Sequence, residues 1–445
     1  MNVTRENFSR IEKLLFDSED VESPEHAKEV LARFKLSVIV GKEYLHSPQH
    51  QLTLLTLCNL ASRAFPGGVY VEGIESDAPL LVNVMSSGSL KQALGMIGGV
   101  HLSSADNVPL IHIGSTSASR RHECNLRCTF ENWSGCVSPV SNDLRLNEDN
   151  LCPLASILAA GLSIAEAFQY RRAELKHKWT NIEAGYRIQG LSLWDPSIID
   201  GWEYVKGPRL MDLPLPDAYW LLGLGHLGQA YAWGLSSVPF VNRSAVRIVL
   251  NDVEELTESN VSTSVLTTIG SIGIKKTRVV AAYLERIGFQ TEIIERRFDG
   301  VFRISDADPH ILLCGVDNLD TRRMLESPGF KLAIDAGLGG TATDYLQLSV
   351  RRFPSRVSAK SVYALGSIAD ANQALYRTEQ YRRLETRVGT CGLERIAGAA
   401  VGVPFTGAVA SSIVLSWAVR AHTEAAPVHY LGISLDGTLY RKTAC

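Results

Sequence analysis

Residues 219–256 read YWLLGLGHLGQAYAWGLSSVPFVNRSAVRIVLNDVEEL, and this stretch decides the fold. An apolar run enters a turn with Gly223, Gly225 and Gly228, and a helical pattern then leads to a second apolar run that ends at Asp252. Glycines at these positions allow a tight turn, close approach of the backbone to phosphates and close packing of helix on strand. Asp252 lies near the position, about 20 residues after such a turn, where a carboxylate binds ribose hydroxyls. The stretch therefore predicts a nucleotide site, without saying whether the nucleotide is a cofactor or a reactant.

Composition limits the class of protein. A chain of 445 residues is long enough for two or three domains of about 150 residues each. A formal net charge of −3 without a basic stripe argues against nucleic-acid binding. The sequence has no apolar run of about 18 residues, which a membrane span would need, and no apolar signal-peptide core near its N-terminus. With eight scattered cysteines, these features lead us to expect a cytoplasmic protein that binds no membrane.

Strand and helix patterns alternate on both sides of an irregular junction. In the first half we expect strands at 36–40, 69–71, 80–84 and 110–113 and helices at 48–64 and 153–170. In the second half we expect strands at 220–222, 246–250, 290–295, 311–314 and 331–335 and helices at 275–287 and 404–421. This alternation is typical of parallel sheets in α/β proteins. We therefore predict two Rossmann-like doubly wound sheets.

The first half lacks the phosphate-binding turn. After the strand at 36–40 the chain reads GKEYLHSP, with no glycine beyond Gly41 at a spacing that would cradle a phosphate. We divide the chain into a nucleotide-type domain without its site at 1–175, a connector at 176–216 and a domain with the site at 217–445.

Four further residues follow the glycine turn in the second half. Asn260 lies where a loop should return over the nucleotide, and Lys276 opens a helix near the expected phosphates. Asp317 follows a strand, where a carboxylate can hold a metal ion against phosphates. Cys391 presents a thiol between two glycines, in a segment with loop character.

The order of these blocks resembles a known family. GLGHLG, LNDVEELTESN, IGIKK, CGVDNLDTRR and IDAGLGG, followed by Cys391, resemble the ThiF/MoeB type of adenylating enzyme, whose domain also drives the activating enzymes of ubiquitin-like proteins. The resemblance covers roughly residues 219–421. The first half resembles the inactive adenylation half of a fused two-half activating enzyme, a plan found in bacterial ubiquitin-like conjugation operons. The resemblance implies a fused pseudo-dimer, either alone or as a homodimer, with its catalytic cysteine segment near 377–400.

The resemblance also implies a role for each residue. The three glycines of the turn would cradle the phosphates of ATP, and Asp252 would bind the ribose. Asn260 and Lys276 would contact phosphates, with Lys276 stabilising charge as the α-phosphate is attacked. Asp317 would hold Mg²⁺, and Cys391 would take the activated carboxylate as a thioester. The implied substrate is the C-terminal carboxylate of a ubiquitin-like protein, which would pass from Cys391 to a conjugating enzyme.

Three departures from the family pattern accompany the resemblance. His226 replaces a glycine of the turn, Thr263 stands where the family has an arginine that contacts the triphosphate, and the zinc-binding CxxC pairs of many relatives are absent. A replacement arginine is offered by Arg10, because Phe8-Ser9-Arg10 resembles the family's N-terminal arginine motif, which reaches across the pseudo-dimer.

Several alternatives stay open at the level of the sequence. The glycine turn with Asp252 also suits a nicotinamide-dependent oxidoreductase, and Thr263 suits an inert scaffold that keeps the fold as a binding platform. Lys276 could be a solvated helix residue, Asp317 a helix N-cap and Cys391 a buried structural thiol. A zinc site is a further alternative, with the candidate ligands His122, Cys124, Cys128 and Cys136.

Overall fold

The computed structural model describes residues 3–117, 122–175, 183–364 and 375–444, with the backbone alone for 438–440. The first half contains α1 (Arg10–Asp17), α2 (Pro24–Leu31), β1 (Leu36–Val40), η1 (Lys42–Leu45), α3 (Pro48–Ala64), β2 (Val69–Glu72), α4 (Leu90–Met96), β3 (Val100–His101), β4 (Leu110–Ile113), β5 (Asn125–Glu131), β6 (Ser134–Pro139), α5 (Pro153–Leu175) and β7 (Gln189–Ser192). The short 3-10 turns η2 (Trp202–Tyr204) and η3 (Leu210–Asp212) lead to the second half.

The second half begins at the strand before the glycine turn. It contains β8 (Ala218–Leu222), α6 (His226–Ser237), η4 (Arg243–Ala245), β9 (Arg247–Asn251), η5 (Glu258–Asn260), η6 (Ile269–Ser271), α7 (Lys276–Arg286), β10 (Gln290–Ile294), β11 (Ile311–Cys314), α8 (Leu319–Arg323), β12 (Leu332–Leu338), β13 (Gln347–Phe353), α9 (Ala359–Val362), α11 (Glu379–Ala397), α12 (Pro404–Arg420), β14 (Tyr430–Ser434) and β15 (Gly437–Ala444). No helix among the described residues is long and apolar enough to cross a membrane.

The two sheets share one strand order, and the second sheet has one more strand than the first. The first has the strand order β3-β2-β1-β4-β5-β6-β7 and the second β10-β9-β8-β11-β12-β13-β14-β15. In each sheet five strands pair in parallel and the strands after them pair antiparallel. The strand order reverses between β1 and β4 in the first sheet and between β8 and β11 in the second, and ligands of such sheets bind at this point. The two Rossmann-like sheets predicted from the sequence are therefore confirmed.

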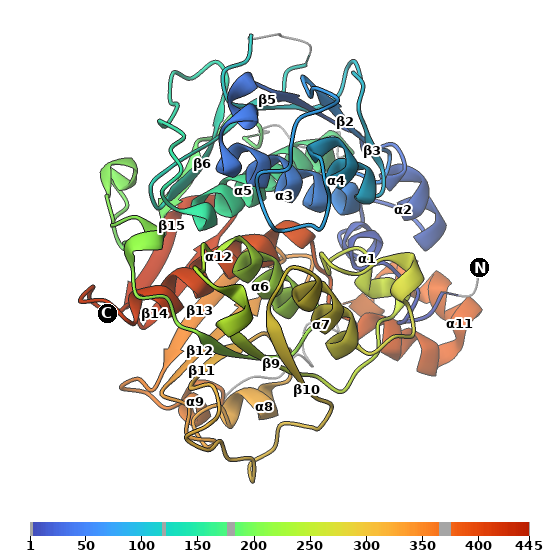
Figure 1. The fold of residues 1–445 in the computed structure, drawn as a ribbon. Coiled ribbons are helices and arrows are strands. Elements are labelled where there is room, and N and C mark those ends of the chain that lie inside the picture. The colour runs from blue at the N-terminus through green and yellow to red at the C-terminus, as the bar shows by residue number, and fades with distance from the viewer. Residues whose placement is uncertain (1–2, 118–121, 176–182, 365–374, 445) are drawn as a thin grey trace.

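Helices from both halves fill the space between the sheets (Figure 1). The helices α3 and α5 of the first half pack together, and α12 packs on both α5 and α6. Small residues let these helices approach closely, since a Cβ atom added at Gly161 would lie 2.8 Å from Val409 and one added at Gly234 would lie 2.4 Å from Leu415. The apolar side chains of the two halves consequently form one continuous core.

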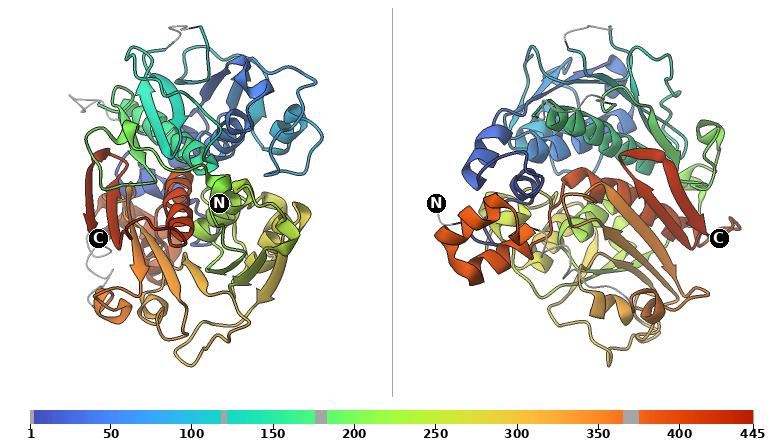
Figure 2. Two further views of the ribbon diagram at one scale, coloured as in Figure 1. Left: turned by 60° about the vertical axis from the view of Figure 1, so that its left-hand side comes forward. Right: turned by 180° about the vertical axis from the view of Figure 1, so that it is seen from behind.

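The N-terminal helices and α11 lie together at one side of the molecule (Figure 2). The rings of Phe16 in α1 and Tyr381 in α11 are 5.2 Å apart, and the Tyr381 hydroxyl donates to Asp17 at 2.6 Å. Arg387 of α11 also pairs with Glu25 of α2 at 2.6 Å. The segment with Cys391 is thus anchored on the part of the chain that carries Arg10.

Two stretches differ from their expected structure. The strand expected at 80–84 is wrong, because the side chain of Gln51 there takes the hydrogen bonds that a neighbouring strand would make. Gln51 accepts from the backbone nitrogen of Leu81 at 2.8 Å and donates to the carbonyl oxygen of Pro79 at 2.9 Å. The range 176–216, expected as an irregular connector, contains β7, which pairs with β6 as the edge of the first sheet.

Candidate functional site

The glycine turn connects β8 to the start of α6 at the carboxyl edge of the second sheet. Gly223 has a φ of 80°, a conformation that disfavours every residue with a Cβ atom. A Cβ atom at Gly228 would lie only 2.0 Å from the carbonyl oxygen of Gly223, so the helix and turn pack without space for a side chain. Gly225 is the N-cap of α6, with no side chain bonded to the first helical amides. These amides and the positive end of the helix dipole suit an anion.

Asp252 joins the end of β9 to this turn. Its carboxylate accepts from the backbone nitrogen of Leu224 at 2.6 Å and from that of Glu254 at 2.8 Å, using one oxygen for each. A carboxylate has about four acceptor positions, so two contacts leave acceptor capacity for ribose hydroxyls.

Lys276 and Asn260 come to the same edge of the sheet. The Nζ atom of Lys276 would lie 3.8 Å from a Cβ atom at Gly225, so the amine lies over the glycine turn. The same amine pairs with Glu254 at 2.5 Å, and its positive charge is the main reason that the pKa of Glu254 is lowered. Lys276 is therefore not a solvated helix residue, since its side chain is only 8% exposed. Asn260 accepts from the backbone nitrogen of Thr257 at 2.9 Å, which closes the first turn of η5.

Arg10 and Asp317 line one cavity of about 130 Å³. The backbone nitrogen of Arg10 donates to Ser262 at 3.2 Å, and its guanidinium donates to the carbonyl oxygen of Ala400 at 3.2 Å. Burial lowers the pKa of Arg10, and the negative charge of Asp317 acts against this lowering. The other residues lining this cavity are Arg5, Phe8, Lys13, Ser259, Ile396, Gly398, Ala399 and Ala400.

The side chain of Arg10 lies beside Thr263. A Cβ atom at Gly402 would lie 3.3 Å from Thr263, 3.8 Å from Arg10 and 3.9 Å from the His226 ring, so the three side chains surround one point. Thr263 is fully buried, and its hydroxyl has no hydrogen-bond partner among the described residues. Burial lowers the pKa of His226 to about 4, with the charge of Arg10 acting in the same direction, so its ring is neutral near pH 7. The cation nearest to Thr263 in this group is therefore Arg10.

Asp317 lies between β11 and the N-cap of α8. The N-cap of α8 is Asn318, which accepts from the backbone nitrogens of Asp320 and Thr321 at 2.8 and 3.2 Å, so the interpretation of Asp317 as the N-cap is wrong. The carboxylate of Asp317 is exposed and makes no hydrogen bond or ion pair with any other described residue.

Cys391 lies in a helix and not in a loop, which corrects the expectation from the sequence. It follows a kink in α11 at Gly389, where φ is 71° and ψ is 167°. A glycine on each side of the thiol suggested a loop, but one of them makes the kink and the other continues the helix. Cys391 is also exposed, so the interpretation as a buried structural thiol is wrong. At about 1.5 Å of rise per residue, it lies roughly 8 Å along the helix from Ile396 at the cavity.

The cysteines of the zinc alternative lie in the core of the first half. Cys128 in β5 and Cys136 in β6 are fully buried, as is Cys124, and burial raises the pKa of Cys128 to about 12. No group of three or more metal-ligating side chains occurs among the described residues, which contradicts the zinc interpretation.

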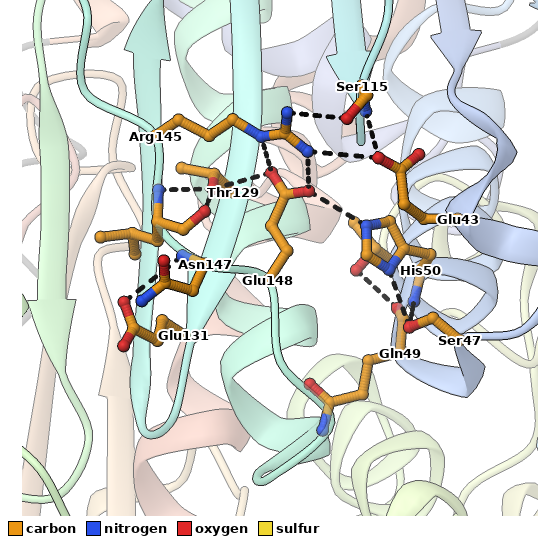
Figure 3. A network of polar contacts seen from close by, with 12 residues as sticks. Glu43, Ser47, Gln49, His50, Ser115, Thr129, Glu131, Arg145, Asn147 and Glu148 are labelled. Atoms are coloured by element: carbon orange, nitrogen blue, oxygen red, sulfur yellow. Dashed lines mark hydrogen bonds and ion pairs between the residues drawn. The ribbon is translucent and has the colours of Figure 1, made fainter.

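In the first half, the same edge of the sheet is filled by a carboxylate. Glu43 extends from η1 into the space between the turns after β1 and β4 (Figure 3). Its Oε2 atom would lie 2.4 Å from a Cβ atom at Gly41 and 2.5 Å from one at Gly114, and its Oε1 atom accepts from the backbone nitrogen of Ser115 at 2.8 Å. Arg145 bonds Ser115 at 2.9 Å and lies 3.4 Å from Glu43. The sequence predicted only that the glycine turn is missing, and nothing in it predicted a carboxylate in its place.

The Arg145 side chain also holds a buried ion pair (Figure 3). It contacts Glu148 at 2.6 Å, and Glu148 contacts the His50 ring at 3.1 Å. These contacts join α3 to the loop after β6 and close this edge of the first sheet.

We expect Glu43→Gln to lower the free energy of unfolding near pH 7 by about 2 kcal/mol, because a charged acceptor is lost at Ser115 and Arg145. Burial acts to raise the pKa of Glu43, but hydrogen bonds from Ser115 outweigh it and lower the pKa to about 2. A depressed folded-state pKa stabilises the fold above the unfolded value of 4.5, and the contribution is lost as the pH falls towards 2. The difference from the wild type in urea unfolding should therefore shrink between pH 5 and pH 3.

Glu75→Gln is the matched control, because Glu75 forms an exposed pair with Lys42 at 2.6 Å in the same region. It should change stability little, since exposed pairs contribute about 0–1 kcal/mol. A loss of unfolding free energy in Glu43→Gln that is no larger than in Glu75→Gln would contradict the expected contribution of Glu43 to stability.

The solved structures that match this chain include two proteins of low similarity. PaaA has a TM-score of 0.34 and 13% identity, over 51% of this chain and 63% of that chain. E. coli MccB with MccA-N7isoASN has a TM-score of 0.35 and 12% identity, over 72% of this chain and 94% of that chain.

Comparison of sequences gives a family. The BilD N-terminal domain matches residues 35–193, and the BilD C-terminal domain matches residues 215–425. The bacterial E1-like protein BilD of Collimonas sp. (strain OK412) is 34% identical over 424 residues, which cover 94% of this chain and 90% of that protein. The chain belongs to the BilD family of bacterial E1-like proteins.

Proposed function

We propose that the chain uses ATP to adenylate the C-terminal carboxylate of a ubiquitin-like protein. The observation that carries the proposal is the cavity in which Arg10, from the N-terminal segment, meets Asp317 at the carboxyl edge of the second sheet. Arg10 lies beside Thr263, the position of the missing family arginine. Membership of an E1-like family favours this reaction over the nicotinamide-dependent alternative.

The adenylation step builds negative charge that the site can offset. A carboxylate oxygen attacks the α-phosphorus of ATP and forms an O–P bond. The bond from the α-phosphorus to the bridging oxygen breaks, and pyrophosphate leaves with the electron pair. Lys276, Arg10 and the first amides of α6 would stabilise the charge on the phosphates without proton transfer. Asp252 would bind the ribose hydroxyls, and Asn260 would contact the phosphates.

The residues present fit a magnesium ion. Mg²⁺ is usually held by one or two carboxylates together with phosphate oxygens. Asp317 is an exposed carboxylate that has no hydrogen bond or ion pair with any other described residue. Asp317 would hold the ion, which would offset charge on the phosphates when bound.

Cys391 would accept the activated carboxylate in the second step. Its thiolate attacks the acyl carbon, an S–C bond forms, the C–O bond to AMP breaks and AMP leaves. The thiol proton passes to solvent. Transfer from this thioester to a conjugating enzyme would complete the reaction, in the cytoplasm. Because Arg10 and the glycine turn belong to one chain, a fused pseudo-dimer needs no second copy for the site, whether or not it forms a homodimer.

ATP–pyrophosphate exchange tests the proposal. We expect exchange that depends on a ubiquitin-like protein whose gene lies near the gene of this chain. The exchange should stop when the C-terminal residue of the ubiquitin-like protein is removed. The absence of exchange with every such partner would instead favour an inert scaffold, for which the buried Thr263 is the specific observation.

Asp317→Asn should raise the Mg²⁺ concentration needed for half-maximal exchange by roughly ten-fold or more, because a charged ligand is lost. Asp320→Asn is the matched control, since Asp320 is an exposed carboxylate in the first turn of α8, close to Asp317 in the chain, and pairs with Arg323. Titration of Mg²⁺ at saturating ATP measures both variants. Equal Mg²⁺ requirements in Asp317→Asn and Asp320→Asn would remove Asp317 from metal binding.

A further inference from the structure

We propose that Arg63, on α3 of the first half, is a positioning residue for the nucleotide-contacting segment 260–267 of the second half. This inference rests on the proposed function, because it concerns the segment that contains Asn260 and Thr263. It also assigns a task to a half that lacks a glycine turn of its own.

The guanidinium of Arg63 binds three carbonyl oxygens of this segment. It donates to Val261 at 2.6 Å, to Val265 at 2.8 Å and to Thr267 at 3.1 Å. Asn59, one turn earlier on α3, donates to the Val265 carbonyl oxygen at 3.1 Å and accepts from the Nε atom of Arg63 at 3.2 Å. Three carbonyl groups therefore converge on a single side chain from the other half.

The charge of Arg63 has no carboxylate partner among the described residues, since no ion pair of this residue occurs there. Burial lowers the pKa of Arg63 to about 10, so the side chain stays charged near pH 7. Its planar fork of donors can reach several carbonyl oxygens at once, whereas a lysine presents a single nitrogen. The charged side chain of Arg63 therefore stabilises the conformation of segment 260–267 through its carbonyl groups, and not through an ion pair.

The same segment is also tied to the glycine turn. Gln229 of α6 accepts from the backbone nitrogen of Leu266 at 2.9 Å and donates to the carbonyl oxygen of Leu224 at 3.2 Å. On the other side, the N-terminal segment contacts it, because the backbone nitrogen of Arg10 donates to the Ser262 hydroxyl at 3.2 Å. A displacement of segment 260–267 would therefore change the positions of residues in both the glycine turn and the cavity that Arg10 lines.

Arg63→Met, Arg63→Lys and Arg243→Met test the inference. Arg63→Met keeps an unbranched apolar stem and removes the Arg63 donor from three carbonyl groups, of which Val265 keeps its bond from Asn59. Arg63→Lys keeps the charge and restores part of the bonding. Arg243→Met is the matched control, because Arg243 also joins the halves, at 2.8 Å from the carbonyl oxygen of Asn83. Its other bonds go to the carbonyl oxygens of Ser236 at 2.6 Å and Ile287 at 3.4 Å, which lie outside segment 260–267.

Exchange of backbone amide hydrogens measures the local stability of segment 260–267 directly, without ATP or a partner protein. The amides of Ser264 and Thr267 are bonded within the segment at 2.9 Å each. We expect them to exchange roughly ten-fold faster in Arg63→Met, at an intermediate rate in Arg63→Lys and at the wild-type rate in Arg243→Met. Unchanged exchange in Arg63→Met would overturn the inference, whatever the catalytic activity of the chain.

The kinetics of ATP–pyrophosphate exchange then measure the effect of each substitution on the reaction. We expect Arg63→Met to raise KM for ATP between about ten-fold and 10²-fold, with partial recovery in Arg63→Lys. A loss of activity shared equally by Arg63→Met and Arg243→Met would mean that the halves separate, and it would overturn the positioning role. If the wild type shows no pyrophosphate exchange, the proposed function fails, while hydrogen exchange still decides the role of Arg63.

Discussion

Arg10→Ala should slow ATP–pyrophosphate exchange by about 10²–10³-fold, the usual loss when one group that stabilises transition-state charge is removed. The guanidinium lies in the cavity with Asp317, bonds the carbonyl oxygen of Ala400 and lies beside Thr263. If Arg10 replaces the family arginine, most of the loss should appear in kcat, because the charge is needed as pyrophosphate leaves. Steady-state exchange over a range of ATP concentrations measures it.

Arg5→Ala is the matched control for this loss. Arg5 lines the same cavity, yet its side chain is exposed, so its charge is screened by water. We expect at most a few-fold change, mainly in KM, and recovery at higher ATP concentration. Equal effects of Arg5→Ala and Arg10→Ala would show that the cavity needs only a general positive charge, and Arg10 would lose its catalytic role.

The sequence predicted the parts of this fold that local patterns encode. The strand Leu36–Val40 and the helix Pro48–Ala64 agree with expectation residue for residue, because an apolar run and a helical repeat identify them. The glycine turn was equally readable, since its geometry admits no Cβ atom at Gly228. Such features depend on residues close together in the chain.

Features that depend on distant residues could not be read in this way. Glu43 fills the edge of the first sheet only because turns near Gly41 and Gly114 come together in the fold. The contacts of Arg63 could likewise not be predicted, since its carbonyl partners lie about 200 residues further along the chain. Such tertiary contacts carry no periodicity, and a lone arginine on a helix has no signal that separates it from a solvated residue.

The kink in α11 explains why the segment around Cys391 was expected to be a loop. Two glycines around a thiol suggest a loop because each lowers helix propensity. In the structure only Gly389 leaves helical geometry, and the residues after it form a helical turn that leads to the cavity. The Cys391 thiol is exposed two residues after the kink, and an acyl acceptor needs to be accessible in this way.

Cys391→Ala should abolish the thioester while leaving ATP–pyrophosphate exchange close to the wild-type rate, because adenylation does not use the thiol. Non-reducing electrophoresis after incubation with ATP, Mg²⁺ and the ubiquitin-like protein would show a covalent adduct for the wild type and none for Cys391→Ala. Cys391→Ser should form an oxygen ester in its place, which resists thiol reagents that release the wild-type adduct.

The remaining cysteines sharpen the outcome of this experiment. Six of the seven described cysteines are buried, and burial raises the pKa of each of these six thiols. A thiolate is the nucleophile, so none of the six is suited to attack an acyl-adenylate. Cys445 lies outside the described residues, and Cys445→Ser is therefore the control. A thiol-sensitive adduct that survives Cys391→Ala but not Cys445→Ser would move the thioester to the C-terminal residue, while adenylation at the glycine turn would stand.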